Sequence, residues 1–169
     1  AVLDGKLKAL YIMGENPALS EPDSNHTAKA LESLELLVVQ DIFMTETAKL
    51  AHVVFPAASA LEKDGTFTNT ERRVLPLRRV MKPKGETKDD WYIIQKLAMA
   101  MGTFWNYRSW EDIMAEINLV IPQYGGITAE RIKNGELIQW PCPGSKHPGT
   151  PVLHTEKFTR GKALIIPVE

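Results

Sequence analysis

Short apolar runs separated by polar segments set the pattern of the first third of the chain. Three of these runs, residues 8–13, 36–39 and 52–55, have the length and composition of buried β-strands. Residues 25–33 place apolar side chains at helical spacing, and Thr45 stands where it would cap a second short helix. Strands that alternate with helices in this way predict a doubly wound parallel sheet.

The first run ends abruptly at a glycine. Residues 10–13 are all apolar and fit a strand buried on both faces, and Gly14 follows directly. Glycine adopts backbone angles closed to other residues and lets a ligand approach closely. Glu15 and Asn16 then lie at the carboxyl end of the strand, before Pro17 blocks its continuation. In open α/β sheets this edge is where ligands bind, nucleotides above all.

The pattern changes after residue 61. Two short β-rich stretches, 66–69 and 74–80, precede a helix that begins at Asp89 or Asp90 and ends before Gly102. A second amphipathic helix follows Ser109, and the tail beyond residue 140 is rich in Pro and Gly, with one last strand expected over 162–168. The inner face of the first helix is expected to carry Trp91, Ile94, Leu97, Ala98 and Met101.

Together these patterns predict an α/β fold, with a three-layer α/β/α Rossmann-like parallel sheet and a smaller mixed α+β second half. We expect a Rossmann-like part over residues 1–60 and a second α/β part with two amphipathic helices over 61–135. Residues 136–169 are expected to form an irregular linker toward a further C-terminal domain. On this interpretation the chain is an internal fragment of a longer protein.

Composition narrows the function classes. The chain has 169 residues, of which 44% are apolar and 24% charged, and its net charge is −1. This balance, without a basic arm, gives no reason to expect nucleic acid as a partner. No apolar run is long enough to span a membrane. We expect a cytoplasmic protein, with the periplasm left open because an upstream part is expected to be missing.

The two best candidates for ligand contact are Gly14 and the Gln40-Asp41 pair at the end of the second predicted strand. An acidic residue there holds a ribose or a base edge in nucleotide-binding sheets. Because a carboxylate accepts two N–H donors at once, Asp41 suits the N1 and N2 edge of guanine. The alternatives are a plain tight turn at Gly14 and an N-terminal helix cap at Asp41. Neither a G-x-G-x-x-G fingerprint nor a P-loop is present.

Other reactive side chains do not assemble a catalytic centre. The four histidines are scattered without metal-ligand spacing, so structural or solvated roles are expected for them. Cys142, the single cysteine, is interpreted as a lone buried or semi-exposed thiol, with a nucleophile or a metal ligand as the less common alternatives. The Glu71-Arg72-Arg73 run is interpreted either as a phosphate-holding cluster or as a solvated charged edge. We therefore predict no catalytic residue and no metal ligand within this chain.

Several longer motifs, taken in order, carry a family resemblance. They are Gly14-Glu-Asn-Pro17, Val39-Gln-Asp-Ile-Phe-Met-Thr-Glu-Thr-Ala48, Ala51-His-Val-Val-Phe-Pro56, Glu62-Lys-Asp-Gly-Thr-Phe-Thr-Asn-Thr-Glu-Arg-Arg73, Asp89-Asp-Trp91 and, more loosely, Gln139-Trp-Pro-Cys142. By these motifs the chain resembles the molybdopterin oxidoreductase family. Within it, the Gln-Asp-Ile-Phe-Met-Thr and Gln-Trp-Pro-Cys segments resemble the catalytic (alpha) subunit of formate dehydrogenases, with periplasmic nitrate reductases as the nearest relatives by motif.

The resemblance implies a molybdenum or tungsten ion held by two molybdopterin guanine dinucleotides. Its Cys or selenocysteine ligand, the iron-sulfur cluster and the formate-handling residues would all lie upstream of this chain. Residues 1–60 would cradle part of one dinucleotide, although Ala57 replaces a hydroxyl residue of some relatives. The residues that the resemblance assigns to cofactor binding are Gly14, Glu15, Asn16 and Ser20 along the dinucleotide, Gln40 and Asp41 at its ribose or guanine, Lys63 at a phosphate or pterin oxygen and Asp90 at guanine.

For the parent protein the resemblance implies oxidation of formate to carbon dioxide, with two electrons passed on. The implied partners are the remainder of the same catalytic subunit, electron-transfer subunits and formate. The isolated chain is expected to be inactive. One alternative is a nitrate reductase-type member of the family. Another is a non-catalytic electron-transfer or structural subunit that kept the fold without molybdenum.

Overall fold

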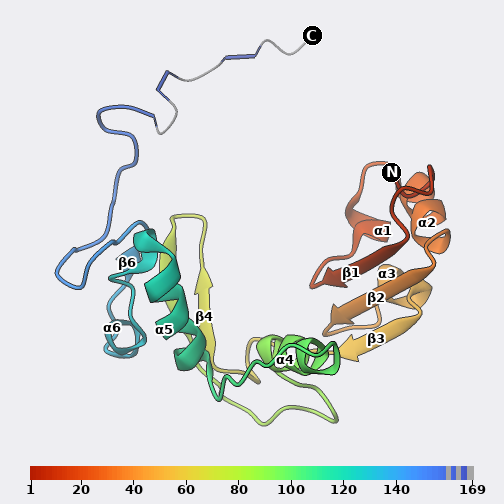
Figure 1. Cartoon of the computed structure of the whole chain (residues 1–169), viewed down its shortest axis with the longest axis horizontal. Helices are drawn as coiled ribbons and strands as arrows, with labels where there is room; N and C mark the ends of the chain where they lie inside the picture. Colours follow the sequence, from red (N-terminus) through yellow and green to blue (C-terminus); the bar gives the residue numbers. More distant parts are fainter. Residues whose placement is uncertain (159–160, 163–164, 167–169) are drawn as a thin grey trace. The chain divides into compact units, whose positions relative to one another are not determined.

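The computed structural model describes residues 1–158, 161–162 and 165–166, and it divides the chain into two compact units (Figure 1). Unit 1 is built from Ala1–Gly65 and Leu77–Trp110. Unit 2 is built from Thr66–Pro76 and the described residues from Glu111 onward. The units are therefore interleaved in sequence, because unit 1 resumes after the first segment of unit 2. The mixed α/β class predicted from the sequence is confirmed.

Unit 1 contains a three-stranded parallel sheet with the strand order β1-β2-β3. Met13 is in register with Gln40, and Asp41 with Pro56, so the carboxyl ends of the three strands meet at one edge. Figure 1 shows the three arrowheads at this edge. The elements of the unit are β1 (Ala9–Met13), α1 (Pro17–Ser20), α2 (Ser24–Glu32), β2 (Leu36–Asp41), α3 (Glu46–Leu50), β3 (Val53–Pro56) and α4 (Asp90–Ala100).

The core of unit 1 lies between β2 and the helices α2 and α3. Leu37 and Val39 of β2 are fully buried on the same face, because alternate residues of a strand point to the same side. They pack with three further buried side chains, Leu31, Leu34 and Ala48. Leu31 belongs to α2, and Leu34 follows the end of that helix, so the helix and its exit both contribute to this core.

Side-chain caps explain where α2 and α3 begin. The carboxylate of Asp23 accepts a hydrogen bond from the His26 amide at 3.0 Å. The hydroxyl of Thr45 accepts one from the Ala48 amide at 3.1 Å. Each cap satisfies a donor that the first helical turn leaves unpaired. The predicted capping role of Thr45 is therefore confirmed.

Two expectations for unit 1 need correction. The strand of residues 10–13 was predicted to be buried on both faces, but β1 lies at an edge of the described sheet and its central residues are only half-buried. In α4 the buried side chains are Ile93 and Gln95, whereas Met101 is 77% exposed. Met101 caps the carboxyl end of the helix, beyond the stretch that packs. The described strands of this sheet lie side by side in sequence order, without the reversal of order that a doubly wound sheet has. The third layer of the expected α/β/α arrangement stays a prediction.

Unit 2 contains a second sheet, with the order β4-β5-β6 and an antiparallel β5–β6 pair. The predicted strand 74–80 is shorter in the structure, where β5 ends at Leu77. The elements are β4 (Gly65–Thr68), β5 (Arg73–Leu77), α5 (Trp110–Val120), the 3-10 helix η1 (Pro122–Tyr124), α6 (Ala129–Lys133) and β6 (Ile138–Gln139). Its buried side chains are Val74, Met114, Ile127, Ile132, Ile138 and Cys142.

Arg72 fixes the irregular segment that follows β6. Its guanidinium donates to the backbone oxygens of Trp140, Thr150 and Pro151, the last two at 3.0 Å. The next residue, Arg73, pairs with Glu71 at 2.9 Å. From the sequence, residues 71–73 were interpreted either as a phosphate-holding cluster or as a solvated charged edge. In the structure Arg72 has a different role, because it donates hydrogen bonds to backbone oxygens within unit 2.

A second arginine, Arg131, holds the same region from α6. It donates to the Gly126 oxygen at 2.7 Å and to the His147 oxygen at 3.2 Å. Its ion pair with Glu136, at 2.7 Å, raises the pKa of the guanidinium, chiefly through the hydrogen bond to that carboxylate. The strand expected over 162–168 falls largely outside the described residues. None of the helices within the described ranges is long and apolar enough to cross a membrane.

Candidate functional site

The candidate site lies at the edge where the three parallel strands of unit 1 end. Gly14 takes a left-handed backbone angle, with φ at +65°, and its amide donates to the backbone oxygen of Gln40 at 2.9 Å. A Cβ added at Gly14 would meet no atom within 4 Å, so its surface side is open. The positive φ disfavours other residues here, which leaves exposed backbone that a ligand can approach.

Asn16 ties the loop after β1 to the start of α3. Its side-chain oxygen accepts from the Thr47 amide at 3.0 Å and from the Thr47 hydroxyl at 2.8 Å. Its amide nitrogen donates to Glu46 at 2.7 Å, and this hydrogen bond is the main reason that the pKa of Glu46 is lowered. The Asn16 side chain therefore holds the loop in place.

A chain of hydrogen bonds joins three of the predicted site residues behind this edge. Gln40 is fully buried, and its amide nitrogen donates to the Asp90 carboxylate at 2.7 Å. The other Asp90 oxygen forms an ion pair with the Lys63 ammonium. Because the three residues come from β2, the loop after β3 and the start of α4, only the folded chain brings them together. We call Tyr11, Gln40, Asp90 and Lys63 the polar network.

Tyr11 is a member of the network that the sequence analysis missed. Its hydroxyl donates to the side-chain oxygen of Gln40, and this fixes the amide of Gln40 with its nitrogen toward Asp90. Burial raises the pKa of the Tyr11 hydroxyl, and the charge of Asp90 raises it further. The one available signal was a hydroxyl in an otherwise apolar predicted strand.

Asp41 takes no part in the polar network, because neighbouring residues of a strand point to opposite faces. One carboxylate oxygen accepts from the Ile42 amide at 2.7 Å and more weakly from the Phe43 amide at 3.4 Å. The other oxygen has no hydrogen-bond partner among the described residues. An aspartate held by its own loop in this way presents a fixed free acceptor.

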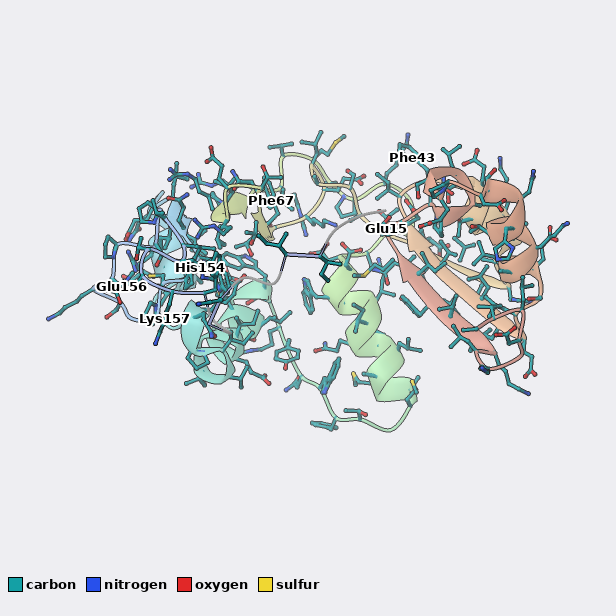
Figure 2. All side chains as sticks on the ribbon, turned by 90° about the horizontal axis from the view of Figure 1, so that it is seen from above. Glu15, Phe43, Phe67, His154, Glu156 and Lys157 are labelled. Carbon is teal, nitrogen blue, oxygen red and sulfur yellow. The ribbon has the colours of Figure 1, made fainter. Side chains whose placement is uncertain are left out.

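The two remaining predicted residues, Glu15 and Ser20, have exposed side chains in the same unit. Glu15 follows Gly14 and is exposed, and Ser20 is the exposed last residue of α1. Figure 2 shows Glu15 and Phe43 on the loops after β1 and β2, and Phe43 is 73% exposed. Ala57 is buried, and its amide donates to the backbone oxygen of Asp41 at 3.0 Å.

Cys142 and two of the histidines have structural partners away from this edge. The Cys142 sulfur is buried, 3.2 Å from the His147 oxygen and 3.5 Å from a nitrogen of Arg131. His52 accepts from the Leu37 amide at 2.9 Å, and His147 from the Gly149 amide at 3.0 Å. In the part of the chain that the structure describes, no group of three His, Cys, Asp or Glu residues is arranged to hold a metal ion.

The groups at this strand edge suit a ligand that carries a phosphate and a nucleotide base. It offers an open backbone at Gly14, a fixed acceptor at Asp41 and an ammonium at Lys63 that a phosphate oxygen can approach. A model of the family described as Molybdopterin oxidoreductase matches residues 1–100. The chain belongs to the molybdopterin oxidoreductase family. The resemblance inferred from the motifs is thereby confirmed.

Curated proteins are similar to this chain over nearly its whole length. The F420-dependent formate dehydrogenase subunit alpha of Methanocaldococcus jannaschii is 56% identical over 167 residues, covering 96% of this chain and 25% of that protein. The probable oxidoreductase YjgC of Bacillus subtilis is 45% identical over 167 residues, covering 98% of this chain and 17% of that protein. The chain thus spans about a quarter or less of these relatives.

A solved structure has a similar fold. The acetylene hydratase from Pelobacter acetylenicus matches with a TM-score of 0.60 and 28% identity, over 79% of this chain and 18% of that protein. The fold of this molybdopterin oxidoreductase chain is therefore shared by a protein whose name describes a different reaction, so the fold alone does not fix the substrate.

Proposed function

We propose that the chain is a segment of the catalytic subunit of a formate dehydrogenase-like molybdopterin oxidoreductase. In this proposal it contributes one half of a cradle for a molybdopterin guanine dinucleotide. The observation that carries the proposal is the meeting of Gly14, Asp41 and the polar network at one strand edge, in a chain 56% identical to a formate dehydrogenase alpha subunit. The 28% identity to acetylene hydratase gives a hydratase much weaker support.

The predicted residues would contact different parts of the dinucleotide. Gly14, Glu15, Asn16 and Ser20 would follow the dinucleotide, with the side chain of Asn16 holding the loop. The free oxygen of Asp41 would accept from the guanine N–H groups. Such hydrogen bonds to a charged acceptor are stronger than those between neutral groups.

The polar network would provide the second binding element. The Lys63 ammonium, which pairs with Asp90, would also donate a hydrogen bond to a phosphate or pterin oxygen. Asp90 would accept a hydrogen bond from guanine and is positioned by Gln40 and Tyr11. Because Gln40 is fully buried, this arrangement is held by the protein before any ligand arrives. A preorganised acceptor loses less entropy on binding than a mobile one.

The cofactor, in which two dinucleotides would hold molybdenum or tungsten, would supply the two-electron chemistry of the parent. An iron-sulfur cluster upstream would carry the electrons to partner subunits, and formate would be the substrate. This chain supplies binding and orientation only. We place the parent in the cytoplasm, in keeping with the composition of the chain.

The third layer of the expected fold also belongs to the parent in this proposal. Met13, Leu36 and Val53 of the parallel sheet are 40–48% exposed. Covering this face with further segments of the catalytic subunit would complete a three-layer α/β/α Rossmann-like arrangement, since apolar sheet faces are normally covered.

The full-length parent protein provides the test. When purified without oxygen, it is expected to reduce an artificial dye with formate and to release guanine nucleotide after acid hydrolysis. The isolated chain, assayed alongside, is expected to show no formate oxidation because it lacks the metal ligand. A parent that binds adenine or cytosine nucleotide instead, or formate oxidation by the isolated chain, would overturn the proposal.

A further inference from the structure

Unit 1 contains a cavity of about 520 Å³ beside the start of α4. Small-molecule sites in proteins usually have volumes of about 300–1,000 Å³, so the cavity has the size of a ligand pocket. None of the eight residues assigned above to the dinucleotide lines it. Its chemically distinctive lining residues are Arg79, Lys82, Lys88, Asp89, Trp91 and Tyr92.

The lining carries a surplus of positive charge. The lining has three cationic side chains and one carboxylate, that of Asp89, and Arg79 also lies 3.8 Å from the carboxylate of Asp64, which leaves a local formal surplus of one (3 − 2). Arg79 lies 3.5 Å from Asp89, so that carboxylate is already engaged. The ammonium groups of Lys82 and Lys88 have no protein partner among the described residues. Because the whole chain has a net charge of −1, this surplus is a local feature that favours an anion.

Two aromatic rings add a flat apolar surface to the same cavity. Trp91 and Tyr92 meet edge to face, with ring centroids 5.9 Å apart. The ammonium of Lys96 lies 5.3 Å from the centroid of the Tyr92 ring and occupies one of its faces. The indole of Trp91 is therefore the better surface for a flat ligand ring, since stacking needs an open face.

Consecutive aspartates keep this cavity separate from the polar network. Asp89 interacts with Arg79, whereas Asp90 binds Gln40 and Lys63. The loop that precedes the helix is fixed as well, because the Thr87 hydroxyl donates to the backbone oxygen of Lys84 at 2.9 Å. The two sites thus use different side chains of one helix start.

We propose that this cavity binds a nucleoside phosphate. Lys82 and Lys88 hold the phosphate group, for which a lysine ammonium is a suitable point charge. Trp91 contacts the base. The concave shape and the combination of cations with an aromatic ring favour this ligand class over inorganic phosphate alone. The proposal does not rest on the function proposed above.

A matched set of ligands tests the proposal on the chain of 169 residues by amide NMR. AMP is expected to shift the signals of Lys82, Lys88 and Trp91 in a saturable way. Ribose 5-phosphate, which lacks the base, and adenosine, which lacks the phosphate, are each expected to bind about tenfold more weakly. The double variant Lys82→Gln/Lys88→Gln is expected to weaken AMP binding about tenfold, while Lys29→Gln, an exposed lysine of α2, leaves it unchanged.

The outcomes separate this site from the guanine site. Shifts of the cavity residues with AMP support the proposal whatever GDP does at Gly14 and Asp41. Absent or non-saturable shifts at the cavity would overturn it. Equal affinity for AMP and ribose 5-phosphate would also overturn it, because the ring would then have no part. Binding of an acidic peptide but not of AMP would identify a protein-docking surface instead and contradict the proposal.

Discussion

Replacing Gly126 by alanine is expected to destabilise unit 2 by about 3 kcal/mol. A Cβ at this position would overlap the backbone oxygen of Gly144 and lie 2.7 Å from the Cys142 sulfur. The Gly126 amide also donates to the Cys142 oxygen at 2.7 Å, which holds the two segments together. Since backbone atoms cannot swing aside like a side-chain end, both segments must move. Exchange of the Trp140 amide, which donates to the Arg72 oxygen, should become about a hundredfold faster.

Gly144→Ala is the matched control for this prediction. A Cβ there would meet no atom within 4 Å, and Gly144 has no positive φ, so the same chemical change should alter amide exchange little. Similar exchange rates in the two variants would show that the segments around Gly126 and Cys142 are not packed as the structure has them.

Replacing Gln40 by leucine is expected to lower the free energy of unfolding of unit 1 by about 2 kcal/mol. Leucine fills a similar volume, so the cost comes from lost hydrogen bonds. The Tyr11 hydroxyl loses its acceptor and the Asp90 carboxylate loses a donor. Amide exchange at His52, which donates to the Leu37 oxygen at 2.9 Å in the parallel sheet, reports the stability of this unit.

A double-mutant cycle separates the lost hydrogen bond from general damage to the core. Tyr11→Phe removes the hydroxyl that Gln40→Leu leaves without an acceptor. The double variant should therefore be more stable than the sum of the two single effects predicts, by about 1 kcal/mol. Strictly additive effects would mean that Tyr11 and Gln40 do not interact, against the geometry of the polar network.

Local patterns were enough to predict the framework of unit 1. The three apolar runs form the parallel strands, and Thr45 caps α3 as its position suggested. Gly14 does terminate β1 with a left-handed backbone angle. These features depend on residues near each other in sequence, where periodicity and backbone preference act directly.

Features that depend on distant partners could not be predicted. Gln40 and Asp90 are 50 residues apart, and no local pattern indicates that one donates to the other. Arg72 was misinterpreted for the same reason, since its acceptors Thr150 and Pro151 lie in a segment without periodicity. Met101 was placed on a packed face because the helical pattern does not show where the neighbouring surface ends. The division into domains at residues 60 and 135 stays a prediction about the parent protein.

We have proposed that the strand edge of unit 1 holds a guanine nucleotide, and an amide NMR titration of the chain with GDP tests this binding. Shifts are expected to cluster at Gly14, Asn16, Gln40 and Asp90. Asp41→Asn keeps an oxygen for the Ile42 amide but loses the charge, so it should weaken binding about tenfold.

Two controls complete this measurement. Asp4→Asn changes an exposed aspartate near the amino terminus and should leave the GDP affinity unchanged. ADP lacks the guanine N–H donors and should bind about tenfold more weakly than GDP. A saturable response that is selective for GDP and weakened only by Asp41→Asn is the result predicted here. Shifts that are absent from this edge, or that are the same for ADP and in Asp41→Asn, would contradict the claim.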